Sequence, residues 1–83
     1  MAYELFTKVA LKADLPAHKL KRGDVATVVE AHPGRQGQEP GYSLEVFNAV
    51  GETIAVVTVG ESQIEPLNSK EVLHVRRLDG VGV

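Results

Sequence analysis

The stretch YSLEVFNAVGETIAVVTVG, Tyr42–Gly60, decides the fold. Its first part alternates apolar and polar residues, and its last part is rich in β-branched residues, as β-strands are. Between them lie Asn48 and Gly51, two residue types that tolerate the left-handed backbone of a tight turn. The stretch therefore predicts a β-hairpin. Its second strand is apolar on both faces, which is typical of a central strand.

The flanking sequence adds further short strands. DVATVVEAH, ending at His32, alternates with a period of two, and LFTKVALKADL does so in part. PGRQGQEPG, residues 33–41, is a loop by composition. GESQIEPLN predicts one tight 3-10 turn, because Pro66 blocks a longer helix. The pattern predicts an all-β fold, a small five-stranded antiparallel barrel of the SH3-like kind with a short 3-10 turn before the last strand.

The chain length of 83 residues predicts one domain, spanning residues 1–83. Its core is expected at about residues 6–67, with residues 68–83 as a tail or an extra strand. The apolar side chains expected to fill the core are Val25, Val29, Leu44, Val46, Ile54, Val56 and Leu67.

The order of these motifs resembles a known pattern. VALKADLPAHKLKRGDVATVV, then GYSLEVFNAVGETIAVVTV, then SQIEPL follow one another between Phe6 and Leu67. They resemble an uncharacterised family of small bacterial proteins, frequent in cyanobacteria. That family is similar in pattern to the SH3-like barrel of the nitrile hydratase beta subunit, and more distantly to KOW-type barrels. The resemblance implies the barrel fold and implies no activity.

Composition narrows the function classes. The chain has no cysteine, and its net charge is −2. No apolar run reaches the length of a signal peptide or of a membrane span, so we expect a cytoplasmic protein without a membrane partner. Residues 1–23 hold five lysines and arginines against two acids, whereas residues 24–71 hold two against eight. A mildly acidic domain with one basic patch is a poor general nucleic-acid binder.

The leading hypothesis is a non-enzymatic module that binds another protein, as an accessory subunit or as the partner of a neighbouring gene product. It is expected as a monomer or a weak homo-oligomer. We place the binding groove between the loops 14–22 and 33–41, because loops on a rigid sheet are common binding elements. The candidate partner-binding residues are Asp14, His18, Lys19, Lys21, Arg22, His32 and Arg35.

Two other binding functions remain open. The first is a KOW-like nucleic-acid module that uses the basic loop 19–22, although such sites usually add stacking aromatic residues. The second is an antitoxin or immunity-type protein whose acidic face neutralises a basic partner. The glutamates of that face are Glu45, Glu52, Glu61, Glu65 and Glu71.

We expect no enzyme activity, no cofactor and no metal site. Ser43, Ser62 and Ser69 lack the sequence context of a nucleophile elbow. No glycine-rich phosphate-binding motif occurs. The histidines are widely spaced, and we expect three exposed polar rings; His18 and His32, which flank one hairpin, are the one pair that could approach each other.

Overall fold

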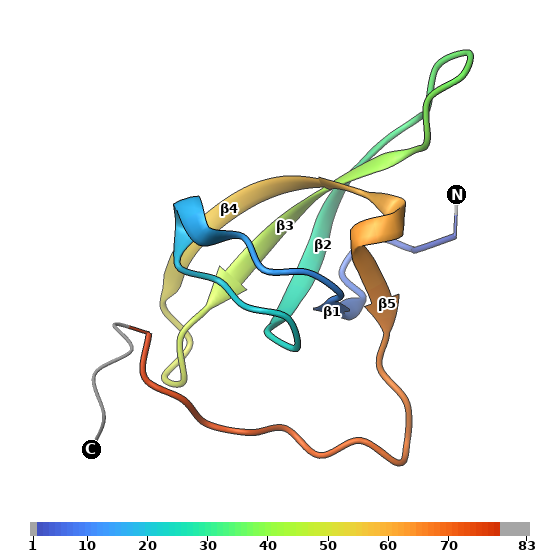
Figure 1. Cartoon of the computed structure of the whole chain (residues 1–83). Helices are drawn as coiled ribbons and strands as arrows, with labels where there is room; N and C mark the ends of the chain where they lie inside the picture. The colour runs from blue at the N-terminus through green and yellow to red at the C-terminus, as the bar shows by residue number, and fades with distance from the viewer. Residues whose placement is uncertain (1, 79–83) are drawn as a thin grey trace.

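The computed structural model describes residues 2–78 as five strands and two 3-10 turns (Figure 1). The strands pair antiparallel in one open, strongly curved sheet in the order β4-β3-β2-β1-β5. The predicted small five-stranded, SH3-like barrel with a 3-10 turn before the last strand is confirmed. No helix within residues 2–78 is long and apolar enough to cross a membrane. In chain order, the elements are β1 (Lys8–Leu11), η1 (Pro16–His18), β2 (Val25–His32), β3 (Gly41–Phe47), β4 (Thr53–Gly60), η2 (Glu61–Gln63) and β5 (Ile64–Pro66).

The turn between β3 and β4 forms where the sequence predicts it. The Asn48 Oδ1 atom accepts hydrogen bonds from the backbone amides of Val50 at 3.1 Å and Glu52 at 2.9 Å. Gly51 has a φ of 88°, a conformation that side chains with a Cβ rarely adopt. Asn48 therefore supplies the hydrogen bonds of the turn, and Gly51 supplies its backbone freedom.

The first long loop, residues 14–22, is an ordered hairpin around η1. Leu15 and Leu20 form a β-bridge, and the Asp14 Oδ1 atom accepts a hydrogen bond from the Arg22 amide at 2.8 Å. Lys19 ends η1 in the left-handed conformation, with a φ of 59°. Leu20 is buried in the core and fixes this loop against the sheet.

The core uses the opposite face of two strands from the one expected. On β2 the buried residues are Ala26 and Val28, while the expected Val25 and Val29 are only half-buried. A strand apolar on both faces does not reveal which face points inward, and a shift of one residue exchanges the faces. The buried apolar residues are Val9, Ala10, Leu11, Leu20, Ala26, Val28, Tyr42, Leu44, Val46, Val57, Val59 and Ile64.

The prediction for β4 was wrong in two respects. β4 lies at an edge of the sheet and not at its centre, because only β3 pairs with it. The expected core residues Ile54 and Val56 are exposed by 38% and 61%, whereas Val57 and Val59 are buried. Leu44 and Val46 on β3 are buried as expected, and Leu67 is half-buried.

Replacing Val57 by alanine is expected to lower the free energy of unfolding by about 1–3 kcal/mol, from lost burial and a residual cavity. Val56→Ala on the outer face of the same strand should change it by less than about 0.5 kcal/mol. Urea denaturation of both variants measures the difference. Equal shifts of the two urea midpoints would contradict the observed inward face of β4.

Candidate functional site

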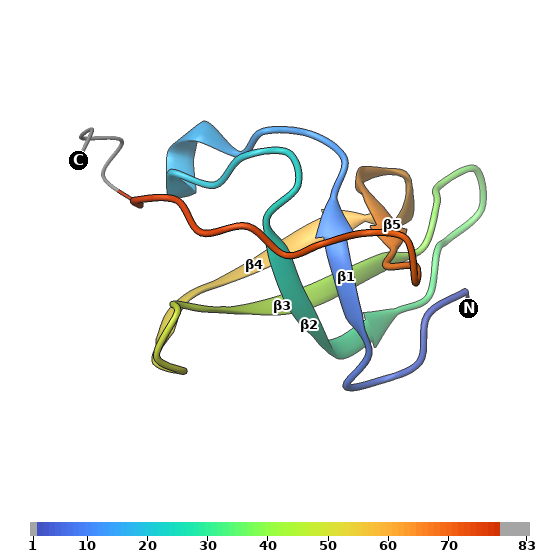
Figure 2. The ribbon, with the colours of Figure 1, turned by 90° about the horizontal axis from the view of Figure 1, so that it is seen from below.

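The two loops expected to border a binding groove lie at opposite ends of the barrel. Loop 14–22 precedes β2 and loop 33–41 follows it, and both views place them far apart (Figures 1 and 2). β2 has eight residues and therefore separates its ends by roughly 26 Å at the usual rise per residue. The predicted groove between these loops is therefore not formed, because the chain enters and leaves a strand at its two ends.

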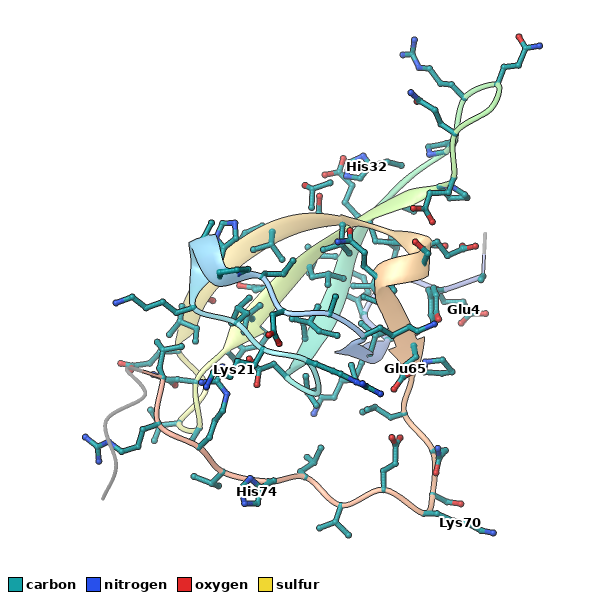
Figure 3. All side chains as sticks on the ribbon, viewed as in Figure 1. Glu4, Lys21, His32, Glu65, Lys70 and His74 are labelled. Atoms are coloured by element: carbon teal, nitrogen blue, oxygen red, sulfur yellow. The ribbon has the colours of Figure 1, made fainter. Side chains whose placement is uncertain are left out.

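The candidate residues divide accordingly. Asp14, His18, Lys19, Lys21 and Arg22 stay together on the first loop. His32 ends β2 on the other side of the molecule, and Arg35 lies on the second loop beyond it; Figure 3 shows Lys21 and His32 on opposite sides. His18 in η1 and His32 at the end of β2 therefore do not form a pair. No group of three or more side chains able to hold a metal ion is found within residues 2–78.

His32 instead contacts Ser43, a pair that the sequence analysis did not find. The His32 Nε2 atom lies 2.7 Å from the Ser43 hydroxyl and 3.9 Å from a carboxylate oxygen of Glu30. In a serine–histidine–acid relay, the acid holds the other ring nitrogen. Here both contacts use the same nitrogen, and the Ser43 hydroxyl also lies 3.4 Å from that of Thr58. This pair therefore lacks the geometry of a relay.

A groove does form elsewhere, under a segment that we call the C-terminal arm, residues 67–78. The arm leaves β5, crosses one end of the barrel without forming a strand and returns to the first loop (Figure 2). It borders an open groove of about 970 Å³, which we call the arm groove. The barrel side of the groove is built from the β3–β4 hairpin and from the region around the start of β2. Its apolar lining on that side includes Leu20, Val25, Val46, Phe47, Val50 and Ile54.

One ion pair holds the far end of the arm. The Arg76 Nε atom donates a hydrogen bond to the Asp24 Oδ1 atom at 2.9 Å, and Arg76 Nη2 contacts the second carboxylate oxygen. Arg76 Nη2 also donates to the Lys19 carbonyl at 3.2 Å, and the Lys21 amide donates to Asp24 at 2.8 Å. Two-point contact between a guanidinium and a carboxylate is geometrically specific and strong for a polar contact. We call this pair the arm latch.

The arm latch also affects the ionisation of both partners. Burial raises the pKa of the Asp24 carboxyl, but the hydrogen bonds from Arg76 and from the Lys21 amide outweigh burial and hold that pKa below its usual value. The hydrogen bond to Asp24 raises the pKa of Arg76 further. Both groups are therefore charged at neutral pH.

The arm presents apolar side chains that the barrel does not cover. Val72 is 90% exposed, Val75 is 81% exposed, and both line the arm groove. In the described part of the chain, no backbone hydrogen bond joins residues 72–75 to another segment. The β3–β4 hairpin opposite carries Val50, which is 80% exposed. The arm side of the open groove thus carries exposed valines and unpaired backbone groups, and the hairpin side carries an exposed valine.

The arm also gathers positive charge at the latch. It brings Arg76 against the Lys19 carbonyl, so that the basic doublet Arg76–Arg77 joins the loop that carries Lys21 and Arg22. The sequence pattern indicated the basic loop 19–22 and gave no link between it and Arg76 or Arg77. Asp24 follows Gly23 and lies 52 residues before Arg76, so no local sequence pattern indicates the contact between them.

Removing the latch is expected to release the arm. Asp24→Asn should increase the mean distance between labels placed at Val50→Cys and Val72→Cys, the only cysteines in such a variant. Because the pKa of Asp24 is lowered by folding, the latch is complete well above the usual value of 3.8 and is lost as the pH falls below it. The wild-type distance should therefore increase only in acid. Double electron–electron resonance measures these distances.

Asp14→Asn is the matched control for this experiment, since Asp14 is an acid of the same loop that bonds the Arg22 amide and not the arm. Its label distance should remain that of the wild type at neutral pH. A distance in Asp24→Asn equal to that in Asp14→Asn would show that the latch does not hold the arm.

One comparison with known proteins gives a match. The model of a family described as "Domain of unknown function (DUF4926)" matches residues 5–66, which include all five strands and exclude the whole arm. Neither the curated proteins nor the solved structures include a match to the chain.

Proposed function

The chain belongs to the family described as Domain of unknown function (DUF4926), and from that premise we propose that it is a non-enzymatic protein-binding module. Its site is the arm groove, and its ligand is an extended apolar segment of a partner protein. The exposure of Val72 and Val75 on the arm, across from Val50 on the barrel, carries the proposal.

Energetics support a protein segment as the ligand. Fully burying one exposed valine or leucine is worth about 1.5–3 kcal/mol, and the groove offers several such side chains. Part of that gain offsets the loss of freedom on association. The unpaired backbone of residues 72–75 adds hydrogen-bonding groups that an extended segment satisfies in β-strand addition.

The resemblance of the sequence to the nitrile hydratase beta-subunit barrel supports a role as an accessory subunit. A barrel similar to that of the nitrile hydratase beta subunit suits an accessory subunit that sits beside a larger protein. We accordingly propose that the chain acts in the bacterial cytoplasm, with the product of a neighbouring gene as its partner.

The test is peptide selection on the intact protein. Peptides selected from a random phage-displayed library should be extended and alternately apolar, and their affinity should fall at least tenfold in the variant Val72→Asp/Val75→Asp. Titration calorimetry measures the affinities.

Phe6→Asp is the matched control, because Phe6 is 74% exposed but lies neither in the lining of the arm groove nor on β4. The selected peptides should bind this variant as tightly as the wild type. Selection of no peptide above background, or equal loss of affinity in both variants, would refute the proposal.

A second candidate function is nucleic-acid binding, and the convergence of the arm on the basic loop favours it. Arg76 and Arg77 add two cations to Lys19, Lys21 and Arg22. Against it, Arg76 is paired with Asp24, and the whole chain is acidic. We therefore rank this function below protein binding.

Fluorescence anisotropy with short single- and double-stranded oligonucleotides, at two salt concentrations, distinguishes the two functions. We expect weak or no binding at near-physiological salt. Three or four phosphate contacts would instead give a slope of log affinity against log salt of roughly −2 to −4. Low-micromolar binding at the higher salt, lost when Lys19, Lys21 and Arg22 are all changed to alanine, would reverse our ranking.

A further inference from the structure

The two edges of the sheet differ in how they are protected. The β5 edge is three residues long and contains Glu65 and Pro66, and charges, prolines and shortness all discourage the pairing of a foreign strand. The β4 edge is eight residues long, and its sequence TIAVVTVG contains no charge and no proline. An unprotected edge of this length is a template for strand addition.

No strand of the described residues pairs with the outer edge of β4. Within the described residues, the backbone of residues 54–59 makes hydrogen bonds only to β3. In Figure 1, β4 forms the upper outline of the barrel, with β3 below it. The outward-facing side chains Ile54 and Val56 are 38% and 61% exposed, so an added strand would also cover apolar surface.

Negative charge surrounds this edge. Residues 36–63, from the loop before β3 to the end of η2, contain four glutamates and no lysine or arginine. Glu52 precedes β4 and Glu61 follows it, while the Glu45 carboxylate accepts a hydrogen bond from the Thr53 hydroxyl at 2.6 Å. The ion pairs Arg76–Asp24 and His32–Glu30 involve none of these four glutamates.

The charge around β4 also favours some added strands over others. A second copy paired antiparallel about Val56 would place Glu52 of one copy beside Gly60 and Glu61 of the other. Like charges at both ends would oppose that dimer. A strand that is uncharged in its centre and basic at both ends would meet the glutamates with opposite charge.

We propose that the β4 edge is a second binding surface, which accepts an extended, uncharged segment of another protein flanked by lysine or arginine and adds it to the sheet as a sixth strand. This inference does not rest on the arm groove: the two surfaces share Ile54, but Val56 and the rest of the β4 edge lie outside the groove lining.

The probe is a synthetic peptide of four alternating valine–threonine pairs with two lysines at each end. Its matched counterpart has glutamates in place of the lysines. The lysine peptide should bind about tenfold or more tightly than the glutamate peptide. It should also slow amide hydrogen exchange in residues 54–59, as measured by NMR.

Two controls make the result specific. In Glu45→Gln/Glu52→Gln, which keeps the acceptor oxygens for Thr53 and Asn48, the preference for the lysine peptide should fall to about threefold or less. In Glu65→Gln/Glu71→Gln, which removes the same charge away from β4, the preference for the lysine peptide should stay about tenfold.

N-methylation of every second peptide amide tests backbone pairing. Methylation of the odd-numbered or of the even-numbered amides, but not of both sets, should abolish binding, because only one side of an added strand faces β4.

Several results would overturn the proposal. Equal binding of the lysine and glutamate peptides would show that charge is not the basis of recognition. Equal effects of methylating the odd-numbered and the even-numbered amides would show that backbone pairing is not. Loss of lysine-peptide binding in Val72→Asp/Val75→Asp would place the peptide in the arm groove. Protection of residues 54–59 that rises with protein concentration alone would identify a second copy as the occupant.

Discussion

The buried Tyr42 side chain fixes the geometry on which the rest of the barrel depends. Its hydroxyl donates a hydrogen bond to the Glu61 carboxylate at 2.8 Å and accepts one from the Ala2 amide at 3.1 Å. Burial, and then the bond to Glu61, raise the pKa of this phenol, so it stays a donor at neutral pH. The Tyr42 side chain points into the core. Because side chains two residues apart on a strand lie on the same face, Leu44 and Val46 also point inward.

The inward face of β3 then determines the inward face of its neighbours. β3 pairs with both β2 and β4, with Leu44 opposite Val28 and Val57. Residues directly opposite in an antiparallel pair lie on the same face, so Val28 and Val57 must be buried. Glu61 also opens η2, which turns the chain from β4 into β5. The contact between Tyr42 and Glu61 thus links β3 to the turn that leads into β5.

This dependence explains how far the sequence predicts the structure. Turns follow from local chemistry, so Asn48 and Gly51 marked the hairpin, and Pro66 the short 3-10 turn. The inward face of β2 or β4 does not follow locally, because Val25 and Val28 are equally apolar. Only pairing with β3 distinguishes them, and that requires the tertiary register. The arm latch is even harder to predict from the sequence, because Asp24 and Arg76 are 52 residues apart and no periodic pattern connects them.

The same topology separates the charges of the chain into two regions. The arm brings Arg76 and Arg77 to the loop of Lys19, Lys21 and Arg22, so the cations gather where the arm closes on the barrel. The β3–β4 hairpin lies within a stretch that has four glutamates and no lysine or arginine. A barrel this small has little interior in which to build a cleft. The two binding surfaces that we propose therefore lie on its edge strand and its terminal arm, which carry unpaired backbone groups, and we propose that the charge around each selects the segment that binds there.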